Sequence, residues 1–256
     1  MKFIPFITAG YPTPALFKKI LFLLEDEGAD IIEIGVPYSD PLADGPTIQN
    51  SSARAIDNGF NLNKTLEIIG EVRKEGLKTQ LVLFSYYNPL LQMGLDNLAD
   101  ALFNNEFNGI LVPDLPIEES DMLKKALKPY NIPLISLIAP TSKERIRLIA
   151  ENAEGFIYIV SSLGVTGVRN SFHGQIFNLI TEVKKTAKVP VILGFGISKR
   201  SQITPFEKDL DGFIIGSALI KAIQKTEEML TDKLGLTDYD ELFLQEIRSF
   251  VRGVLS

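Results

Sequence analysis

The segment from Glu33 to Pro46, EIGVPYSDPLADGP, places three acids among prolines and glycines directly after an apolar run. Glu33 lies within DIIEIG, and the two-residue alternation of a strand puts it on the same face as Ile31 and Gly35. Desolvation raises the pKa of a carboxyl that is buried there without a partner, which suits it to exchange protons near neutral pH. The alternative is a structural carboxylate paired with a nearby cation or a backbone N–H. Position alone leaves both interpretations open.

The other two acids, Asp40 and Asp44, follow in a loop that contains Pro37, Pro41 and Gly45. Proline stiffens such a loop and glycine permits an unusual turn, so a carboxylate can be held against a substrate N–H or a developing positive charge. Asp beside Pro and Gly more commonly caps a turn or the start of a helix. We favour capping for each acid taken separately and a functional role for the group.

Two glycine motifs later in the chain are typical of phosphate binding. GFGIS (Gly194–Ser198) follows one apolar run, and GSALI (Gly216–Ile220) follows the next and opens a helix. Backbone N–H groups at glycines approach an anion closely, and a helix N-terminus adds a favourable dipole. Glycine also ends strands for steric reasons, but the two motifs together favour a phosphate site.

A longer polar loop, SSLGVTGVRNSFHG (Ser161–Gly174), precedes a helical segment. Such a loop could close over a ligand and exclude water, and ordinary surface flexibility is the competing explanation. His173, the one histidine of the chain, falls at the end of this loop, where we expect a structural or solvent role.

Short apolar or β-branched runs recur at even spacing and predict the elements that position these residues. The eight strand candidates are FIPFIT, DIIEIG, QLVLFS, GILVPD, PLISLI, GFIYIV, PVILGF and DGFIIG. Helical periodicity is expected over Pro14–Glu27, Leu62–Glu75, Leu95–Asn104, Ile117–Leu127, Ser142–Glu151, Ser171–Lys185, Ser198–Phe206 and Tyr239–Val254. Helix-start signals are Ser142, Asn63 and, for the fourth helix, either Ser120 or the acidic pair Glu118 and Glu119.

The repeated βα order predicts an α/β fold of one domain, a (β/α)8 TIM barrel over residues 1–256. Strands that are apolar at nearly every position fit parallel strands covered on both faces, and no linker divides the chain. The active site of such a barrel lies at the C-terminal ends of its strands, where the acids and both glycine motifs follow.

Composition excludes several classes of function. The net charge is −6 and neither sign forms a long block, so we expect no nucleic acid and no anionic membrane as partner. The absence of cysteine excludes thiolate nucleophiles, and a single histidine cannot build a metal cluster, so no metal site is expected. No apolar run approaches the roughly 20 residues that span a bilayer, and the first residues are too short an apolar region for a secretory signal, which favours the cytoplasm.

Six segments, taken in their order and spacing, resemble the tryptophan synthase alpha chain family: FITAGYP, EIGVPYSDPLADGPTIQ, VPDLP, SSLGVTGVR, GFGIS and IGSAL. The resemblance runs from Phe3 essentially to the C-terminus. The second segment is highly specific, whereas the glycine motifs occur in many phosphate-binding barrels. Many relatives carry an extra helix before the first strand, while this sequence begins almost at that strand.

The resemblance implies a lyase that splits indole-3-glycerol phosphate into indole and glyceraldehyde 3-phosphate by retro-aldol cleavage, with no cofactor and no metal in this chain. Glu33 matches the catalytic acid/base of the family, and Asp44 matches its second catalytic acid, which hydrogen-bonds the indole N–H. Phosphate would be held by Gly167, Gly196, Gly216 and Ser217. The implied substrate-binding residues are Phe6, Thr8, Ile48, Phe84, Tyr86 and Phe195 around the indole, Tyr158 near the glycerol chain, and Thr166, which would latch over the site and touch Asp44.

The resemblance further implies a partner, a tryptophan synthase beta chain that carries pyridoxal phosphate, in an alpha2beta2 heterotetramer. Residues of two loops, Pro37, Asp40, Asn88 and Pro89, would contribute to that contact. Three alternatives stay open at this point: a stand-alone indole-3-glycerol phosphate lyase, a non-catalytic barrel that activates a beta chain, and another phosphosugar barrel enzyme such as an isomerase. The last would not need PYSDPLADGP after its second strand.

Overall fold

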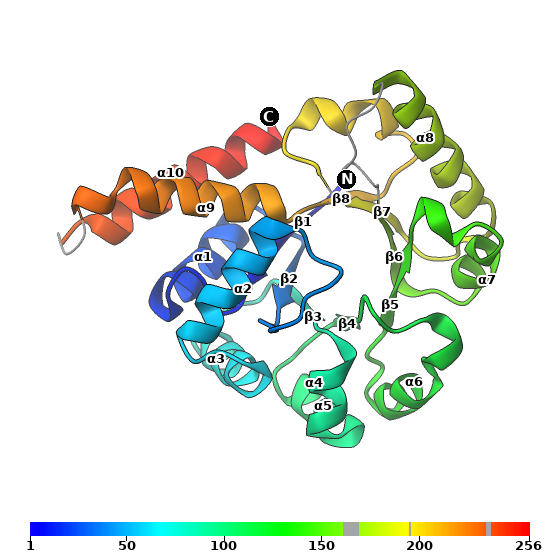
Figure 1. Cartoon of the computed structure of the whole chain (residues 1–256), viewed down its shortest axis with the longest axis horizontal. Helices are drawn as coiled ribbons and strands as arrows, with labels where there is room; N and C mark the ends of the chain where they lie inside the picture. Colours follow the sequence, from blue (N-terminus) through cyan, green and yellow to red (C-terminus); the bar gives the residue numbers. More distant parts are fainter. Residues whose placement is uncertain (161–168, 195, 234–236) are drawn as a thin grey trace.

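Eight parallel strands close into a barrel in chain order, with β8 pairing back to β1 (Figure 1). The structure is a computed structural model that describes residues 1–160, 169–194, 196–233 and 237–256. Its strands are β1 (Lys2–Thr8), β2 (Ile31–Gly35), β3 (Gln80–Phe84), β4 (Gly109–Leu111), β5 (Leu134–Ile138), β6 (Glu154–Val160), β7 (Val191–Gly194) and β8 (Gly212–Ile215). Each lies at one of the predicted runs, so the prediction of a (β/α)8 barrel is confirmed.

Helices between the strands form the outer layer of the barrel (Figure 1). They are α1 (Pro14–Asp26), α2 (Pro46–Asp57), α3 (Leu62–Lys74), α4 (Tyr87–Met93), α5 (Leu95–Asn104), α6 (Asp121–Leu127), α7 (Arg145–Glu151), α8 (Arg169–Thr186), α9 (Ser217–Met229) and α10 (Tyr239–Leu255). Short 3-10 turns are η1 (Ile117–Glu119), η2 (Lys128–Tyr130), η3 (Pro140–Ser142), η4 (Arg200–Gln202), η5 (Thr204–Phe206) and η6 (Thr231–Lys233).

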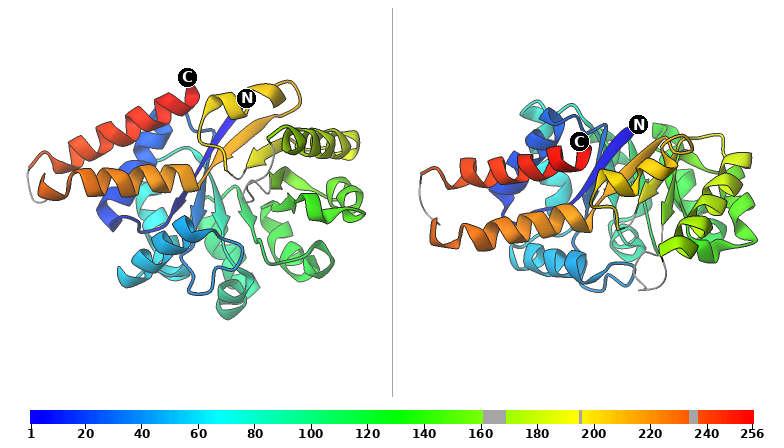
Figure 2. Two further views of the ribbon diagram at one scale, coloured as in Figure 1. Left: turned by 45° about the horizontal axis from the view of Figure 1, so that its top comes forward. Right: turned by 90° about the horizontal axis from the view of Figure 1, so that it is seen from above.

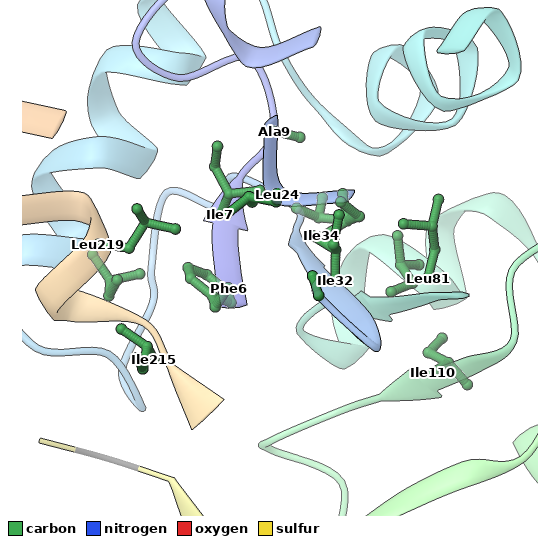
Figure 3. Close-up of a cluster of buried hydrophobic side chains, with 14 of the residues drawn as sticks. Phe6, Ile7, Ala9, Leu24, Ile32, Ile34, Leu81, Ile110, Ile215 and Leu219 are labelled. Carbon is green, nitrogen blue, oxygen red and sulfur yellow. The ribbon is translucent and has the colours of Figure 1, made fainter. Parts of the chain in front are cut away.

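The strands bury both of their faces, and alternation decides which side chains fill the barrel. One cluster fills the interior and includes Ile4, Ile31 and Ile192. Residues on the opposite face of the strands, such as Ile7, Ile32 and Ile34, belong to the cluster that packs under the helices (Figure 3). A slip of one residue would exchange the two sets, so the hydrophobic pattern fixes the register that carries Glu33 to the interior.

Three local predictions are wrong. The segment Ser198–Phe206 forms the turns η4 and η5 instead of an α-helix, and Pro205 within it has no backbone N–H to donate. Helix α3 begins at Leu62 because Asn61, not Asn63, caps it by accepting a hydrogen bond from Lys64 N at 3.1 Å. Helix α7 begins only at Arg145, because the Ser142 hydroxyl accepts the N–H of Ala139 within η3.

Helix α9 leads away from the barrel, and α10 lies beside it and runs back toward the strands (Figure 2). Helix α9 also packs against α2 and β1, and α10 against α1. Within the described part of the chain, no helix has the length and apolar character required to cross a membrane.

Candidate active site

A cavity of about 500 Å³ lies at the C-terminal ends of the strands and brings together nine of the predicted site residues. These are Phe6, Glu33, Asp44, Ile48, Phe84, Tyr158, Gly196, Gly216 and Ser217. They come from β1, β2, β3 and β6, from the loops after β2, β7 and β8, and from the starts of α2 and α9. The site is therefore assembled from segments that are far apart in sequence, as expected for a barrel enzyme.

Glu33 is buried in β2, with 1% of its surface exposed. Its Oε1 has no hydrogen-bond partner among the described residues, and no cation of that part of the chain forms an ion pair with it. Burial raises the pKa of Glu33 to about 8. The described residues therefore give no support to a structural carboxylate with a fixed partner, and the carboxyl is free to exchange a proton with a ligand in the cavity.

Asp44 is held in the loop between β2 and α2. Tyr86 Oη donates a hydrogen bond to Asp44 Oδ2 at 3.0 Å and accepts one from the N–H of Ala43 at 2.9 Å. Gly45 occupies the cap position of α2 and no side chain caps that helix, so Asp44 does not serve as its cap. Burial raises the pKa of Asp44 to about 6, and the bond from Tyr86 opposes this rise.

The two carboxyls thus differ in their preferred state of protonation. Near neutral pH, Glu33 with a pKa of about 8 is mainly protonated, whereas Asp44 with a pKa of about 6 is mainly ionised. The cause is their surroundings: Glu33 lies in the apolar barrel interior and Asp44 in a polar loop. Two acids with separated pKa values can take the separate roles of proton donor and fixed anion.

Glycines at the strand ends make room for two rings of the cavity. A Cβ on Gly194 would lie 2.0 Å from Cε2 of Tyr158, and a Cβ on Gly35 would lie 2.4 Å from Cζ of Phe6. Burial raises the pKa of Tyr158 well above its ordinary value, and the nearby Glu33 charge acts in the same direction, so its hydroxyl keeps its proton. The sequence signal for these glycines is their place at the end of a strand, at interior positions of the alternation.

Three of the residues predicted to bind phosphate line the same cavity. Gly196, Gly216 and Ser217 line it together, and α9 begins at Ser217 without a side-chain cap. The first N–H groups of a helix lack partners within the helix, and they attract an anion together with the helix dipole.

Helices α2 and α9, which carry Ile48 and Ser217, are joined by side-chain hydrogen bonds. Arg54 of α2 forms two hydrogen bonds of 2.7 Å with the carboxylate of Glu227 of α9. The hydroxyl of the buried Tyr11 donates a third bond to Glu227 at 3.0 Å. This connection fixes the distance between two walls of the site.

Several predicted residues do not line the cavity. The hydroxyl of Thr8 lies 2.7 Å from Ser51 Oγ of α2, and Tyr86 acts on Asp44 instead of forming the cavity wall. Thr166, Gly167 and Phe195 lie outside the described residues, as does most of the loop Ser161–Gly174. Among the predicted partner residues, Asp40 and Asn88 are exposed and Pro89 is partly exposed, whereas Pro37 is buried and presents no surface.

Ten other residues of the cavity were not among the predicted site residues: Ala43, Gly45, Pro46, Thr47, Pro113, Leu137, Ala139, Ser142, Val160 and Lys221. Leu137 and Val160 are interior positions near the ends of β5 and β6, so alternation carried along each strand would have found them. Lys221 comes from the second turn of α9, where no strand-end signal applies. No group of three or more His, Cys, Asp or Glu side chains in the described ranges is arranged to hold a metal ion.

The fold and the cavity define the class of protein: a (β/α)8-barrel enzyme whose cavity holds one buried and one partly buried carboxyl group. A sequence profile of the family described as "Tryptophan synthase alpha chain" matches residues 1–245. The chain belongs to the tryptophan synthase alpha chain family, lyases that split indole-3-glycerol phosphate into indole and glyceraldehyde 3-phosphate.

Individual relatives agree with this assignment. The tryptophan synthase alpha chain of Geobacillus sp. (strain WCH70) is 48% identical over 252 residues, which cover 98% of this chain and 94% of the relative. The crystal structure of the tryptophan synthase subunit alpha of Legionella pneumophila is similar with a TM-score of 0.82 at 30% identity, covering 98% of this chain and 92% of that one. A chain of the tryptophan synthase complex of Pyrococcus furiosus has a TM-score of 0.83 at 32% identity, covering 99% and 97%.

Proposed function

We propose that Glu33 and Asp44 divide the work of cleaving indole-3-glycerol phosphate in this chain. The observation that carries this proposal is that the two carboxyls line one cavity with pKa values of about 8 and about 6. A neutral acid and a fixed anion are the two groups that this retro-aldol cleavage requires.

Glu33 transfers the protons. Its carboxyl gives a proton to indole C3. The product is an indolenine-like cation whose positive charge is centred on the ring nitrogen. The carboxylate left behind takes the proton of the glycerol hydroxyl beside the scissile bond. The electrons of that O–H bond form the aldehyde C=O, the bond between indole C3 and the glycerol carbon breaks, and its electron pair returns to the ring. Glu33 ends protonated, as it began.

Asp44 stabilises the cation as it forms. Its carboxylate accepts a hydrogen bond from the indole N–H, and the bond from Tyr86 Oη keeps the group oriented and ionised. Because Tyr86 and the loop backbone hold this anion before the substrate arrives, little reorganisation is needed in the transition state.

The apolar part of the cavity accommodates the indole ring and its glycine-rich end accommodates the phosphate. Phe6, Ile48 and Phe84, together with the residues missed from sequence, Leu137 and Val160, supply apolar walls. Gly196, Gly216 and Ser217 offer backbone N–H groups to the phosphate, and Tyr158 lines the same cavity near Glu33. The roles given to Thr166, Gly167 and Phe195 from the resemblance stay predictions. Thr8 and Tyr86 do not line the cavity, and we assign them to holding α2 and Asp44.

The proposed partner is a tryptophan synthase beta chain that holds pyridoxal phosphate, in an alpha2beta2 heterotetramer, and this chain itself holds no cofactor. The similarity to a chain of the Pyrococcus furiosus tryptophan synthase complex supports this pairing. Asp40 lies at the surface on the loop after β2, where Leu42 is 84% exposed, and Asn88 and the partly exposed Pro89 lie at the start of α4. We place the protein in the cytoplasm and treat residues 1–256 as one catalytic domain.

The test is an indole-release assay with indole-3-glycerol phosphate, with and without a beta chain. Glu33→Gln should lose most of its turnover, and Asp44→Asn should keep its affinity for inorganic phosphate while losing most cleavage. Asp57→Asn, an exposed acid at the end of α2, is the matched control and should behave as wild type. Near wild-type turnover of Glu33→Gln would refute the proton-transfer role, and full activity without any acceleration by a beta chain would favour the stand-alone lyase.

A further inference from the structure

Lys221 is the one basic side chain among the described residues that line the cavity, which also contains Glu33 and Asp44. It lies four residues after Ser217 on α9, so both side chains project from the same face of the helix. Ser217 and Gly216 form the phosphate end of the cavity, and Lys221 therefore extends that end by one helical turn.

The side chain of Lys221 also borders a second cavity, of about 620 Å³, in the groove between α9 and α10. The two cavities share Gly196, Ser217 and Lys221, so the lysine stands where they meet. Lys225, one turn further along α9, lines only the second cavity.

Lys221 has no partner within the described part of the chain. Other lysines there, such as Lys18 and Lys184, form ion pairs with acids at 2.8 Å or less, whereas neither an ion pair nor a hydrogen bond involves Lys221. It is exposed, so its ammonium group can reach an anion without breaking another contact.

A phosphate monoester brings close to two negative charges into a cavity that already holds the ionised Asp44. The start of α9 offers about half a positive charge. With backbone N–H groups alone, the occupied cavity therefore keeps a net negative charge. One ammonium group would reduce this charge.

We propose that Lys221 is a specificity-determining residue of this site, whose ammonium pairs with the phosphate oxygens of the substrate and selects phosphorylated over unphosphorylated compounds. This inference rests on the proposed function, since it names the cation that completes its phosphate end. We assign Lys221 no part in proton transfer: it comes from α9, whereas Glu33 lies on β2.

The experiment compares Lys221→Met with Lys225→Met, which removes the same charge from the same helix one turn away. Lys221→Met should raise the KM for indole-3-glycerol phosphate by about 5- to 10-fold and leave kcat within about twofold, because the lost contact is made equally in ground and transition states. In the reverse reaction it should raise the KM for glyceraldehyde 3-phosphate and leave that for indole unchanged. Lys225→Met should match wild type, and Lys221→Arg should restore affinity.

Direct binding of inorganic phosphate, measured by calorimetry, separates this inference from the proposed function. Weaker binding to Lys221→Met than to Lys225→Met supports the role of Lys221 even where cleavage of indole-3-glycerol phosphate fails. Equal phosphate binding and equal KM values for the two variants, with circular dichroism showing both folded, would overturn the inference while leaving the roles of Glu33 and Asp44 untouched.

Discussion

Replacing Tyr86 by Phe should move the acidic limb of the pH profile without touching the substrate. The change removes one hydroxyl, which donates to Asp44 Oδ2 at 3.0 Å and accepts from the N–H of Ala43 at 2.9 Å. The bond to Asp44 stabilises the ionised carboxylate, so its loss raises the pKa of Asp44 from its present value of about 6. Because cleavage needs Asp44 ionised, activity should require a higher pH.

The size of the effect follows from the energy of the bond. A hydrogen bond to a charged group contributes about 1.5 to 3 kcal/mol, and a loss near the lower end changes a pKa by about one unit. With the pKa of Asp44 near 7 instead of 6, the ionised fraction at pH 6 falls from about one half to about one tenth. We expect kcat/KM to fall about fivefold at pH 6 and about twofold at pH 7.

The assay is kcat/KM for indole release between pH 5 and pH 9, which reports the pKa values of the free enzyme. The basic limb, set by Glu33 with its pKa of about 8, should stay in place. Tyr38→Phe is the matched control, because the Tyr38 ring stacks on that of Tyr86 at 5.1 Å while its hydroxyl accepts only a long bond of 3.5 Å from Asn88. An acidic limb of Tyr86→Phe that overlays wild type, or an equal movement in Tyr38→Phe, would refute the reasoning.

Two further predictions concern stability. Glu33 holds its proton more tightly in the folded chain, with a pKa of about 8 against an ordinary 4.5, so the free energy of unfolding should decrease as pH rises between these values and level off above about 8. Urea unfolding should show wild type losing about 2 kcal/mol between pH 6.5 and pH 8.5, and Glu33→Gln should lose far less; parallel curves would contradict this. Gly35→Ala should destabilise the fold by about 1 to 3 kcal/mol, because its Cβ would meet the Phe6 ring at 2.4 Å. Gly45→Ala, with nothing within 4 Å, should cost much less in the same thermal unfolding measurement, and equal losses would show that the ring is not the cause.

Most of the fold could be predicted from the apolar runs of the sequence and from the period of its apolar residues. The apolar runs located all eight strands, and the period of two placed Glu33 on the same face as Ile31. The structure shows that this face is the interior of the barrel. Helix α5, which has a strong apolar stripe, was predicted with its observed ends, Leu95–Asn104. The seven-residue helix α4 was not predicted, because it has one buried residue and hence no periodic signal.

Side chains that act on other side chains could not be read from the sequence. Tyr86 follows the last residue of β3 by two positions, and the family resemblance placed it in the indole pocket. The strand ends at Phe84, so the alternation stops there and the Tyr86 hydroxyl reaches Asp44 of the neighbouring loop. The hydroxyl of Thr8 likewise meets Ser51, a helix residue 43 positions away. Such pairings depend on the distance between two elements, which one sequence does not state.

The contact between Gly35 and Phe6 makes the order of substitutions matter during evolution. A smaller side chain in place of Phe6 enlarges the cavity in one step and leaves the strand backbone as it is. A larger residue at position 35 is destabilising while Phe6 is present, because the ring lies 2.4 Å from the place of a Cβ on Gly35. Such a residue is tolerated only after Phe6 has been replaced. Once both residues have been replaced, Phe6 cannot be regained before Gly35, because its ring would meet the larger side chain at position 35. The shape of this pocket would therefore depend on the order of earlier substitutions.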